Sequence, residues 1–100
     1  MGGSSILAAT ILKSTSELLG NPLSPRSLLF LASQVEQIMT TGGGWQDQLG
    51  AIYGGFKIGT SERGLPMRIS CKKLTVSEQF KRAFEQRTRL IYTGKHRLEK

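Results

Sequence analysis

The hydrophobic period of this chain changes near residue 55, and the change indicates a run of helices followed by a part that contains strands. Before it, apolar residues recur at intervals of three and four, the spacing of one helix face. After it, apolar residues alternate with basic or small residues in Phe56–Gly59 and Met67–Leu74, the pattern of half-buried strands. With 100 residues, the chain has room for one small domain at most. The expected class is α+β, with helices packed on a small mixed or antiparallel sheet.

Three helices are expected before residue 55, because Ser, Gly and Pro stand where helices begin and end. The expected helices are Ser5–Leu19, capped by Ser4 or Ser5 and ended by Gly20; Pro25–Met39, capped by Ser24; and the shorter Trp45–Tyr53. Their apolar stripes are expected to face the core. These stripes comprise Ile6, Leu7, Ile11, Leu12, Leu18 and Leu19, then Leu28, Leu29, Leu31, Ala32, Val35, Ile38 and Met39, and finally Leu49 and Ile52.

A strand pair, a helix and a last strand are expected after residue 55. The strand pair turns near residues 63–66 and its inward side chains are expected to be Phe56, Ile58, Met67, Ile69 and Cys71. A helix follows within Thr75–Arg87, with Thr75 or Ser77 as its cap. The stretch Arg89–Gly94, "RLIYTG", is expected to be a strand, and "KHRLEK" after it reads as the opening of a further helix.

The charge balance favours an anionic ligand, since 14 Lys and Arg stand against seven Asp and Glu. Nucleic acid is the first partner to consider, but the basic residues are scattered through the C-terminal half without a stripe of interleaved aromatics. Phosphorylated small molecules also suit a basic protein. The longest apolar stretch, Leu28–Ala32, is too short to cross a membrane. A lone Cys71 excludes an internal disulfide, and a reduced cytoplasmic location is the default.

Two glycine-containing loops are the candidates for chemistry. The first is Gly2-Gly3-Ser4-Ser5 at a helix start, where unpaired amides and the helix dipole suit phosphate and a Ser hydroxyl suits Mg²⁺. An ordinary N-cap is the competing interpretation of the same residues. His96 has no partner that the sequence identifies, so it is interpreted as a surface residue.

The second loop lies within "TTGGGWQDQLG", which covers Thr40–Gly50. A run of three glycines is costly to order, so it suggests that main chain approaches a ligand closely. Asp47 is the candidate catalytic base toward a substrate hydroxyl, although an acid at a helix start is also favourable by itself. The candidate substrate-binding residues around Asp47 are Gly43, Gly44, Trp45, Gln46 and Gln48, with Trp45 either stacking on a sugar ring or filling a core gap.

These segments resemble a known kinase superfamily, that of galactokinase, homoserine kinase, mevalonate kinase and phosphomevalonate kinase. "GGSSILAATIL" is similar to its second motif, in which a Gly-rich loop holds the phosphates of ATP at a helix start. "TTGGGWQDQLGAIYGGFKIG" and "RLIYTGKHRLEK" resemble the L-fucokinase branch, and the likeness runs from Met1 to Lys100. The "GxQDQ" pattern is also shared with bacterial heptose-phosphate kinases.

The resemblance implies a role for each matching residue. Gly2, Gly3, Ser4 and Ser5 correspond to the phosphate loop, and Ser5 to the serine that binds Mg²⁺. Asp47 corresponds to the aspartate that accepts or orients the proton of the sugar hydroxyl. The implied reaction is ATP-dependent phosphorylation of L-fucose at its anomeric hydroxyl, with Mg²⁺ as cofactor.

The departures from the superfamily pattern are equally informative. The first and third motifs have no counterpart in the chain, and Gly3 stands where Ser or Thr is usual. We therefore expect an internal piece of a kinase, inactive by itself, with the remainder of the kinase as its partner. Residues 1–74 would belong to the N-terminal domain and residues 75–100 would begin the C-terminal domain. The alternatives are a non-catalytic remnant, a fragment of a heptose-phosphate or galactose-type kinase, and a small basic nucleic-acid-binding domain.

Overall fold

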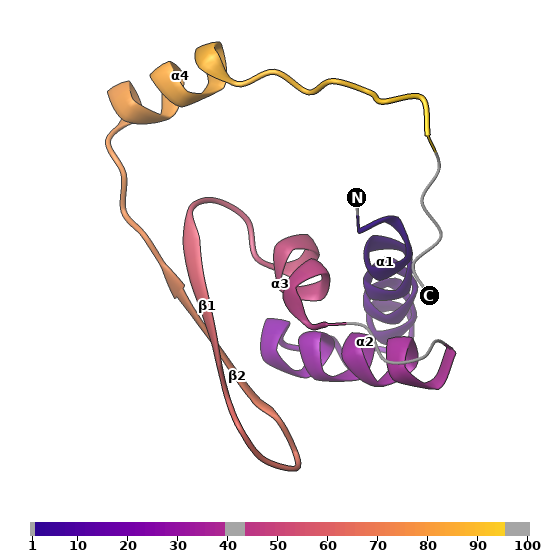
Figure 1. The fold of residues 1–100 in the computed structure, drawn as a ribbon. Helices are drawn as coiled ribbons and strands as arrows, with labels where there is room; N and C mark the ends of the chain where they lie inside the picture. Colours follow the sequence, from indigo (N-terminus) through magenta and orange to yellow (C-terminus); the bar gives the residue numbers. More distant parts are fainter. Residues whose placement is uncertain (1, 40–43, 96–100) are drawn as a thin grey trace.

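A computed structural model describes residues 2–39 and 44–95 of the chain. The elements are, in chain order, α1 (Gly3–Leu18), α2 (Pro25–Met39), α3 (Gln46–Ile52), β1 (Lys57–Glu62), β2 (Arg68–Lys73) and α4 (Glu78–Arg87). Helices α1, α2 and α3 pack together, and the hairpin of β1 and β2 lies beside α3 (Figure 1). The α+β class expected from the sequence is confirmed. The expectations for Gly43, for His96 and for a helix opening in "KHRLEK" fall on residues outside the described part.

The stretch Arg89–Gly94 is not a strand, which corrects the sequence expectation. It follows α4 as irregular chain, and Leu90, Ile91 and Tyr92 are 74–82% exposed. Figure 1 shows this segment running away from the hairpin. Its side chains favour a strand, but a strand needs a neighbour to accept and donate its main-chain hydrogen bonds, and the described sheet consists of β1 and β2 alone.

The turn between α1 and α2 is closed by main-chain and side-chain hydrogen bonds. Gly20 has a φ of 71°, and the amides of Gly20 and Asn21 donate to the carbonyl oxygens of Glu17 and Ser16, both at 3.0 Å. This is the six-to-one and five-to-two pairing that a glycine makes possible after a helix. The expectation that Gly20 ends the first helix is therefore confirmed.

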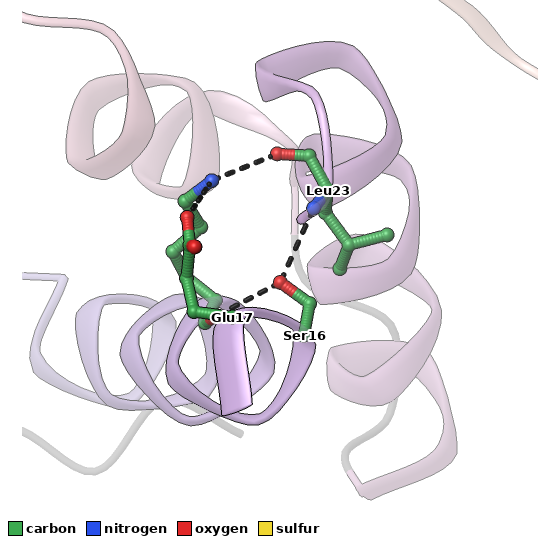
Figure 2. A network of polar contacts seen from close by, with 4 residues as sticks. Ser16, Glu17 and Leu23 are labelled. Carbon is green, nitrogen blue, oxygen red and sulfur yellow. Dashed lines mark hydrogen bonds and ion pairs between the residues drawn. The ribbon is translucent and has the colours of Figure 1, made fainter. Parts of the chain in front are cut away.

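A polar network then fixes the chain that enters α2. Ser16 Oγ donates to the Lys13 carbonyl oxygen at 2.8 Å and accepts from the Leu23 amide at 3.2 Å. Lys13 Nζ donates to the Leu23 carbonyl oxygen at 3.0 Å and pairs with Glu17 at 3.0 Å (Figure 2). Ser24 caps α2 as expected, since its Oγ accepts from the Ser27 amide at 3.2 Å.

The core lies where the three N-terminal helices meet. Its apolar members are Ala9 from α1, Leu28, Leu29 and Ala32 from α2, and Leu49 from α3, all at most 7% exposed. Leu28, Leu29, Ala32 and Leu49 were expected inward, and these expectations are confirmed.

Helix α1 turns a stripe of small residues, not its large apolar residues, toward the core. Ser5, Ala9 and Ser16 are buried, at spacings that keep them on one helix face. The expectation of an apolar inward face is wrong for most of its members: Ile6, Leu7, Ile11, Leu18 and Leu19 on α1, and Leu31, Ile38 and Met39 on α2, are exposed. Small side chains let helix axes approach closely, so the face that packs is not always the most hydrophobic one.

The hairpin presents one face to α3. Its strands are antiparallel, with Gly59 opposite Cys71 and Ile58 opposite Lys72. Gly59 and Cys71 are half-buried, whereas Ile58 is 51% exposed, contrary to expectation. Successive residues of a strand point to opposite faces of the sheet. Because Gly59 faces α3, its neighbour Ile58 faces away from α3 and is exposed.

Helix α4 packs through aromatic rings against Phe56, the residue just before β1. Ser77 caps it by accepting from the Phe80 amide at 3.1 Å, which decides between the two expected caps. Phe56 meets the rings of Phe80 and Phe84 edge-on, at centroid distances of 5.6 and 5.0 Å. Phe80 and Phe84 remain about half exposed, at 52% and 49%.

The chain exposes more surface than a compact protein of its size. Its accessible surface is 8627 Å², whereas a compact protein of this mass exposes about 5,600 Å². Its radius of gyration is 15.5 Å, against about 13 Å for a compact 100-residue domain. Both values agree with the many large apolar side chains that are exposed among the described residues.

Candidate functional site

The two candidate loops of the sequence meet at one polar cavity. This cavity has a volume of about 210 Å³ and is lined by Ser4, Ser5, Glu36, Gly44, Gln46, Asp47 and Gln48. That volume is large enough for a phosphate group and the oxygen that reacts with it.

The first wall of the cavity is the start of α1. Gly2 precedes the helix with a φ of 61° and makes no side-chain cap. The first main-chain hydrogen bond of the helix runs from the Ile6 amide to the Gly2 carbonyl oxygen at 2.9 Å. The amides of Gly3, Ser4 and Ser5 therefore precede the first intrahelical donor, the Ile6 amide, and have no intrahelical acceptor, which is why a helix start attracts an anion. Neither Ser4 nor Ser5 is the N-cap, which corrects the expectation, because the helix begins earlier, at Gly3.

The opposite wall is the first turn of α3, which carries Asp47. A β-carbon placed on Gly2 would lie 3.6 Å from both the β- and γ-carbons of Asp47, so the carboxyl group stands against the main chain that enters α1. Asp47 is exposed and lines the cavity, whereas Ser5, across from it, is only 2% exposed. An acid and a helix start, 45 positions apart in the sequence, thus share one small polar space.

The two glutamines that flank Asp47 have different surroundings. Gln48 is 2% exposed. In the amide orientation that pairs donors with acceptors, its nitrogen donates to the carbonyl oxygens of Gly44 at 2.9 Å and Trp45 at 3.2 Å. Gln46 is exposed, and its carboxamide lies over Gly44.

Trp45 belongs to the packing beneath the loop and does not line the cavity. A β-carbon on Gly59 would lie 2.8 Å from Cζ3 and 3.2 Å from Cη2 of Trp45, so the indole ring rests on β1. The side chain of Leu49 meets Gly59 beside it. The indole ring thus fills space between α3 and β1, and stacking of Trp45 on a sugar ring stays a prediction.

Glu36 is a cavity residue that the sequence analysis missed. It lies on α2 and lines the same cavity as Ser5 and Asp47, so the cavity has a second acidic residue beside Asp47. The sequence does contain a signal that could have identified Glu36. It follows Leu29 by seven positions and Ala32 by four, which places it on the buried face of α2. An acid on the buried face of a helix is unusual and points to a partner or a ligand.

Comparison with known proteins identifies the class to which this fold and cavity belong. Residues 1–55 match the family described as GHMP kinases N terminal domain. The match covers more than half of the chain and includes both walls of the cavity. The chain belongs to the GHMP kinase family.

Within that family, the chain is similar to fucokinases. It is 41% identical over 98 residues to the bifunctional fucokinase/GDP-fucose pyrophosphorylase of Arabidopsis thaliana, a match that covers 98% of this chain and 9% of that protein. It is 39% identical over 64 residues to the L-fucokinase/L-fucose-1-P guanylyltransferase of Bacteroides fragilis, covering 64% of this chain and 7% of that protein. The likeness to the fucokinase branch is therefore confirmed, and the chain spans less than a tenth of the length of these relatives. No solved structure matches it.

Proposed function

We propose that this chain supplies the phosphate loop and the catalytic base of an ATP-dependent sugar kinase that phosphorylates L-fucose at its anomeric hydroxyl. The observation that carries the proposal is the shared cavity, in which Ser4 and Ser5 stand across from Asp47. Phosphoryl transfer requires an anion-binding wall and a group that orients the attacking hydroxyl, and the cavity combines the two. The name of each relative supports fucose as the acceptor.

In this proposal the start of α1 binds the phosphates of ATP. The amides of Gly3, Ser4 and Ser5 precede the first intrahelical bond, and the helix dipole is positive at this end. Gly2 contributes through its left-handed backbone, which lets the chain turn into the helix beside Asp47 without a side chain in the way. Asp47 accepts or orients the proton of the anomeric hydroxyl, and the exposed Gln46 is placed to bind a neighbouring sugar hydroxyl.

The cavity also fits Mg²⁺ by the chemistry of its side chains. Mg²⁺ prefers hard oxygen ligands from one or two protein groups together with phosphate oxygens. Ser5 and Glu36 line the same cavity, and their side chains carry a hydroxyl and a carboxylate. We propose that these two side chains hold the ion. When bound, Mg²⁺ neutralises charge on the phosphate oxygens.

The remaining expectations become part of the same proposal. The enzyme acts in the cytoplasm, residues 1–74 belong to its N-terminal domain, and residues 75–100 begin a second domain. Within the described residues, no helix combines the length and the apolar character needed to span a bilayer.

The direct test is transfer of radiolabelled phosphate from ATP to sugar by the complete product of the gene that encodes this chain. We expect labelled L-fucose phosphate that is lost in mild acid, because an anomeric phosphate leaves through an oxocarbenium-like state, whereas a phosphate on another hydroxyl is stable. Preference for galactose or for a heptose phosphate would support the alternative kinases. Binding of ATP and fucose without transfer would show a non-catalytic remnant.

A further inference from the structure

Two identical side chains, Gln46 and Gln48, flank Asp47, and the structure gives them opposite environments. Gln46 is exposed at the cavity, where a ligand has access to its carboxamide. Gln48 is 2% exposed and its carboxamide nitrogen is already engaged by two main-chain oxygens. Sequence spacing alone does not separate the two, because both are polar and both neighbour the acid.

The contacts of Gln48 tie the glycine-rich loop to the helix that follows it. The side chain comes from the first turn of α3 and reaches back to the carbonyl oxygens of Gly44, at 2.9 Å, and Trp45, at 3.2 Å. Trp45 is the N-cap of α3 and has no side-chain cap of its own. The bonds from Gln48 therefore restrain the main chain at the place where a glycine would otherwise leave it free.

This restraint acts on Asp47, because Asp47 lies between the anchored residues and Gln48 itself. The Trp45 carbonyl oxygen also accepts a hydrogen bond from the Leu49 amide at 3.0 Å. One oxygen therefore accepts both the side-chain bond from Gln48 and the first main-chain bond of α3. On the other side, Asp47 stands against Gly2. A shift of the loop would move the carboxyl group along this contact and away from the start of α1.

We propose that Gln48 is a positioning residue, which holds Asp47 beside Gly2 through the main chain of Gly44 and Trp45, and that Gln46 is the glutamine left to contact the sugar. The expected effect on kcat rests on the proposed function. The expected effect on the structure of the loop rests on the hydrogen bonds of Gln48 alone. It gives the motif a division of labour: one glutamine sets geometry and the other contributes recognition.

Matched methionine variants separate the two roles, because methionine has the length of glutamine and lacks the donor. In the 100-residue chain, Gln48→Met should speed hydrogen exchange of the Leu49 amide about tenfold, the scale of two lost neutral hydrogen bonds. The amide of Leu19, which donates to the Thr15 carbonyl oxygen at the end of α1, should exchange at an unchanged rate. Gln46→Met should leave both unchanged. Equal exchange at Leu49 in the wild type and Gln48→Met would overturn the proposal, whether or not the protein is a kinase.

Kinetics of the complete gene product test the consequence for catalysis. Gln48→Met should lower kcat for fucose about tenfold or more with KM within about twofold, because a misplaced acid weakens the chemical step more than binding. Gln46→Met should raise KM for fucose and leave kcat nearly unchanged. A raised KM with normal kcat in Gln48→Met would make Gln48 a sugar ligand and overturn the proposal.

A pH profile distinguishes positioning from simple loss of folded protein. In Gln48→Glu, the new carboxyl group is buried beside two carbonyl oxygens, which raises its pKa. Its protonated form donates one of the two bonds, so the kcat deficit should shrink as the pH falls, in protein that circular dichroism shows to be folded. In Gln48→Met the kcat deficit should not change with pH in this way. A pH-independent kcat deficit in Gln48→Glu would count against the proposal. If the wild type transfers no phosphate, the proposed function fails while the exchange result still decides the role of Gln48.

Discussion

Gly59 on β1 and Trp45 at the start of α3 are in such close contact that a β-carbon on Gly59 would lie 2.8 Å from Cζ3 of the indole ring. This contact joins the hairpin to the helix that carries Asp47. It also explains why a strand with exposed Ile58 still docks: the face without a side chain is the one that receives the ring. The position of α3, which carries Asp47 into the cavity, therefore depends on Gly59 having no side chain, although Gly59 lies outside the cavity.

Gly59→Ala should destabilise the chain by about 1–3 kcal/mol, the cost of forcing a methyl group into a filled space. The gain from a less flexible unfolded chain offsets part of this cost. Urea unfolding followed by circular dichroism would measure it. A neutral or stabilising result would show that the ring moves aside freely.

Gly50→Ala is the matched control, with the opposite expected sign. Gly50 lies inside α3, is exposed, and would present its new β-carbon to nothing within 4 Å. Alanine is favoured over glycine in a helix interior by about 0.5–1 kcal/mol. Gly50→Ala should therefore raise the unfolding free energy in the same assay that detects the loss from Gly59→Ala.

Asp47→Asn should reduce kcat of the complete gene product by about 100-fold or more, the scale of a lost general base, while ATP binding stays nearly the same. The carboxamide keeps the size of the side chain and loses its capacity to accept a proton. Steady-state kinetics and nucleotide titration would measure the two quantities. Glu85→Gln, which removes an exposed acid on α4, is the control for charge alone. Near-normal turnover in Asp47→Asn would remove Asp47 from the mechanism.

Ser5→Ala should raise the Mg²⁺ concentration needed for half-maximal activity more than it changes the KM for sugar. The reason is that Ser5 offers a hydroxyl oxygen to the ion from a buried position, whereas the exposed Ser4 is expected to act through its amide. Ser4→Ala is the matched control and should leave the Mg²⁺ titration unchanged. The same titration curve for Ser5→Ala and wild type would leave Ser5 as a helix-packing residue only.

The 100-residue chain by itself should associate at rising concentration, because large apolar side chains on α1 are exposed. Leu7, Ile11 and Leu18 are 60%, 56% and 87% exposed. Side chains of this kind are stabilised when another surface covers them. Sedimentation velocity over a concentration series would detect the association, and Ile11→Glu should weaken it. A monomer at all concentrations would contradict the expectation.

The chain by itself should give no measurable ATP-dependent phosphorylation of L-fucose. The described cavity combines one helix start with the candidate base Asp47, whereas phosphoryl transfer depends on positioning and on charge neutralisation from several sides. The radiolabel assay on the purified chain would decide. Sugar phosphate above background that disappears in Asp47→Asn would show that this chain suffices for catalysis.

Local structure was predictable from the sequence because it depends on neighbours in the chain. Gly20 adopts a left-handed conformation after α1, Ser24 caps α2, and Ser77 caps α4 by bonds to residues within a few positions. The two loops that line the cavity were also predictable, since a Gly–Ser helix start and an acid beside glycines carry their chemistry in the local sequence.

Burial, by contrast, was decided by the tertiary structure. Ser5 and Ala9 face the core while Ile11 and Leu18 face outward, because close approach of α1 to its neighbours favours small side chains at the contact. Arg89–Gly94 has strand-forming residues but no described strand beside it, and main-chain hydrogen bonds need that partner.

The cavity shows the same division at the level of single residues. Asp47 could be recognised from its own segment, but Glu36 reaches the cavity only because α2 packs against the other helices. The difference between Gln46 and Gln48 likewise depends on which side chain the fold buries. Chemistry follows from residue type, whereas position relative to distant residues follows from packing, which adjacent residues in the sequence do not specify.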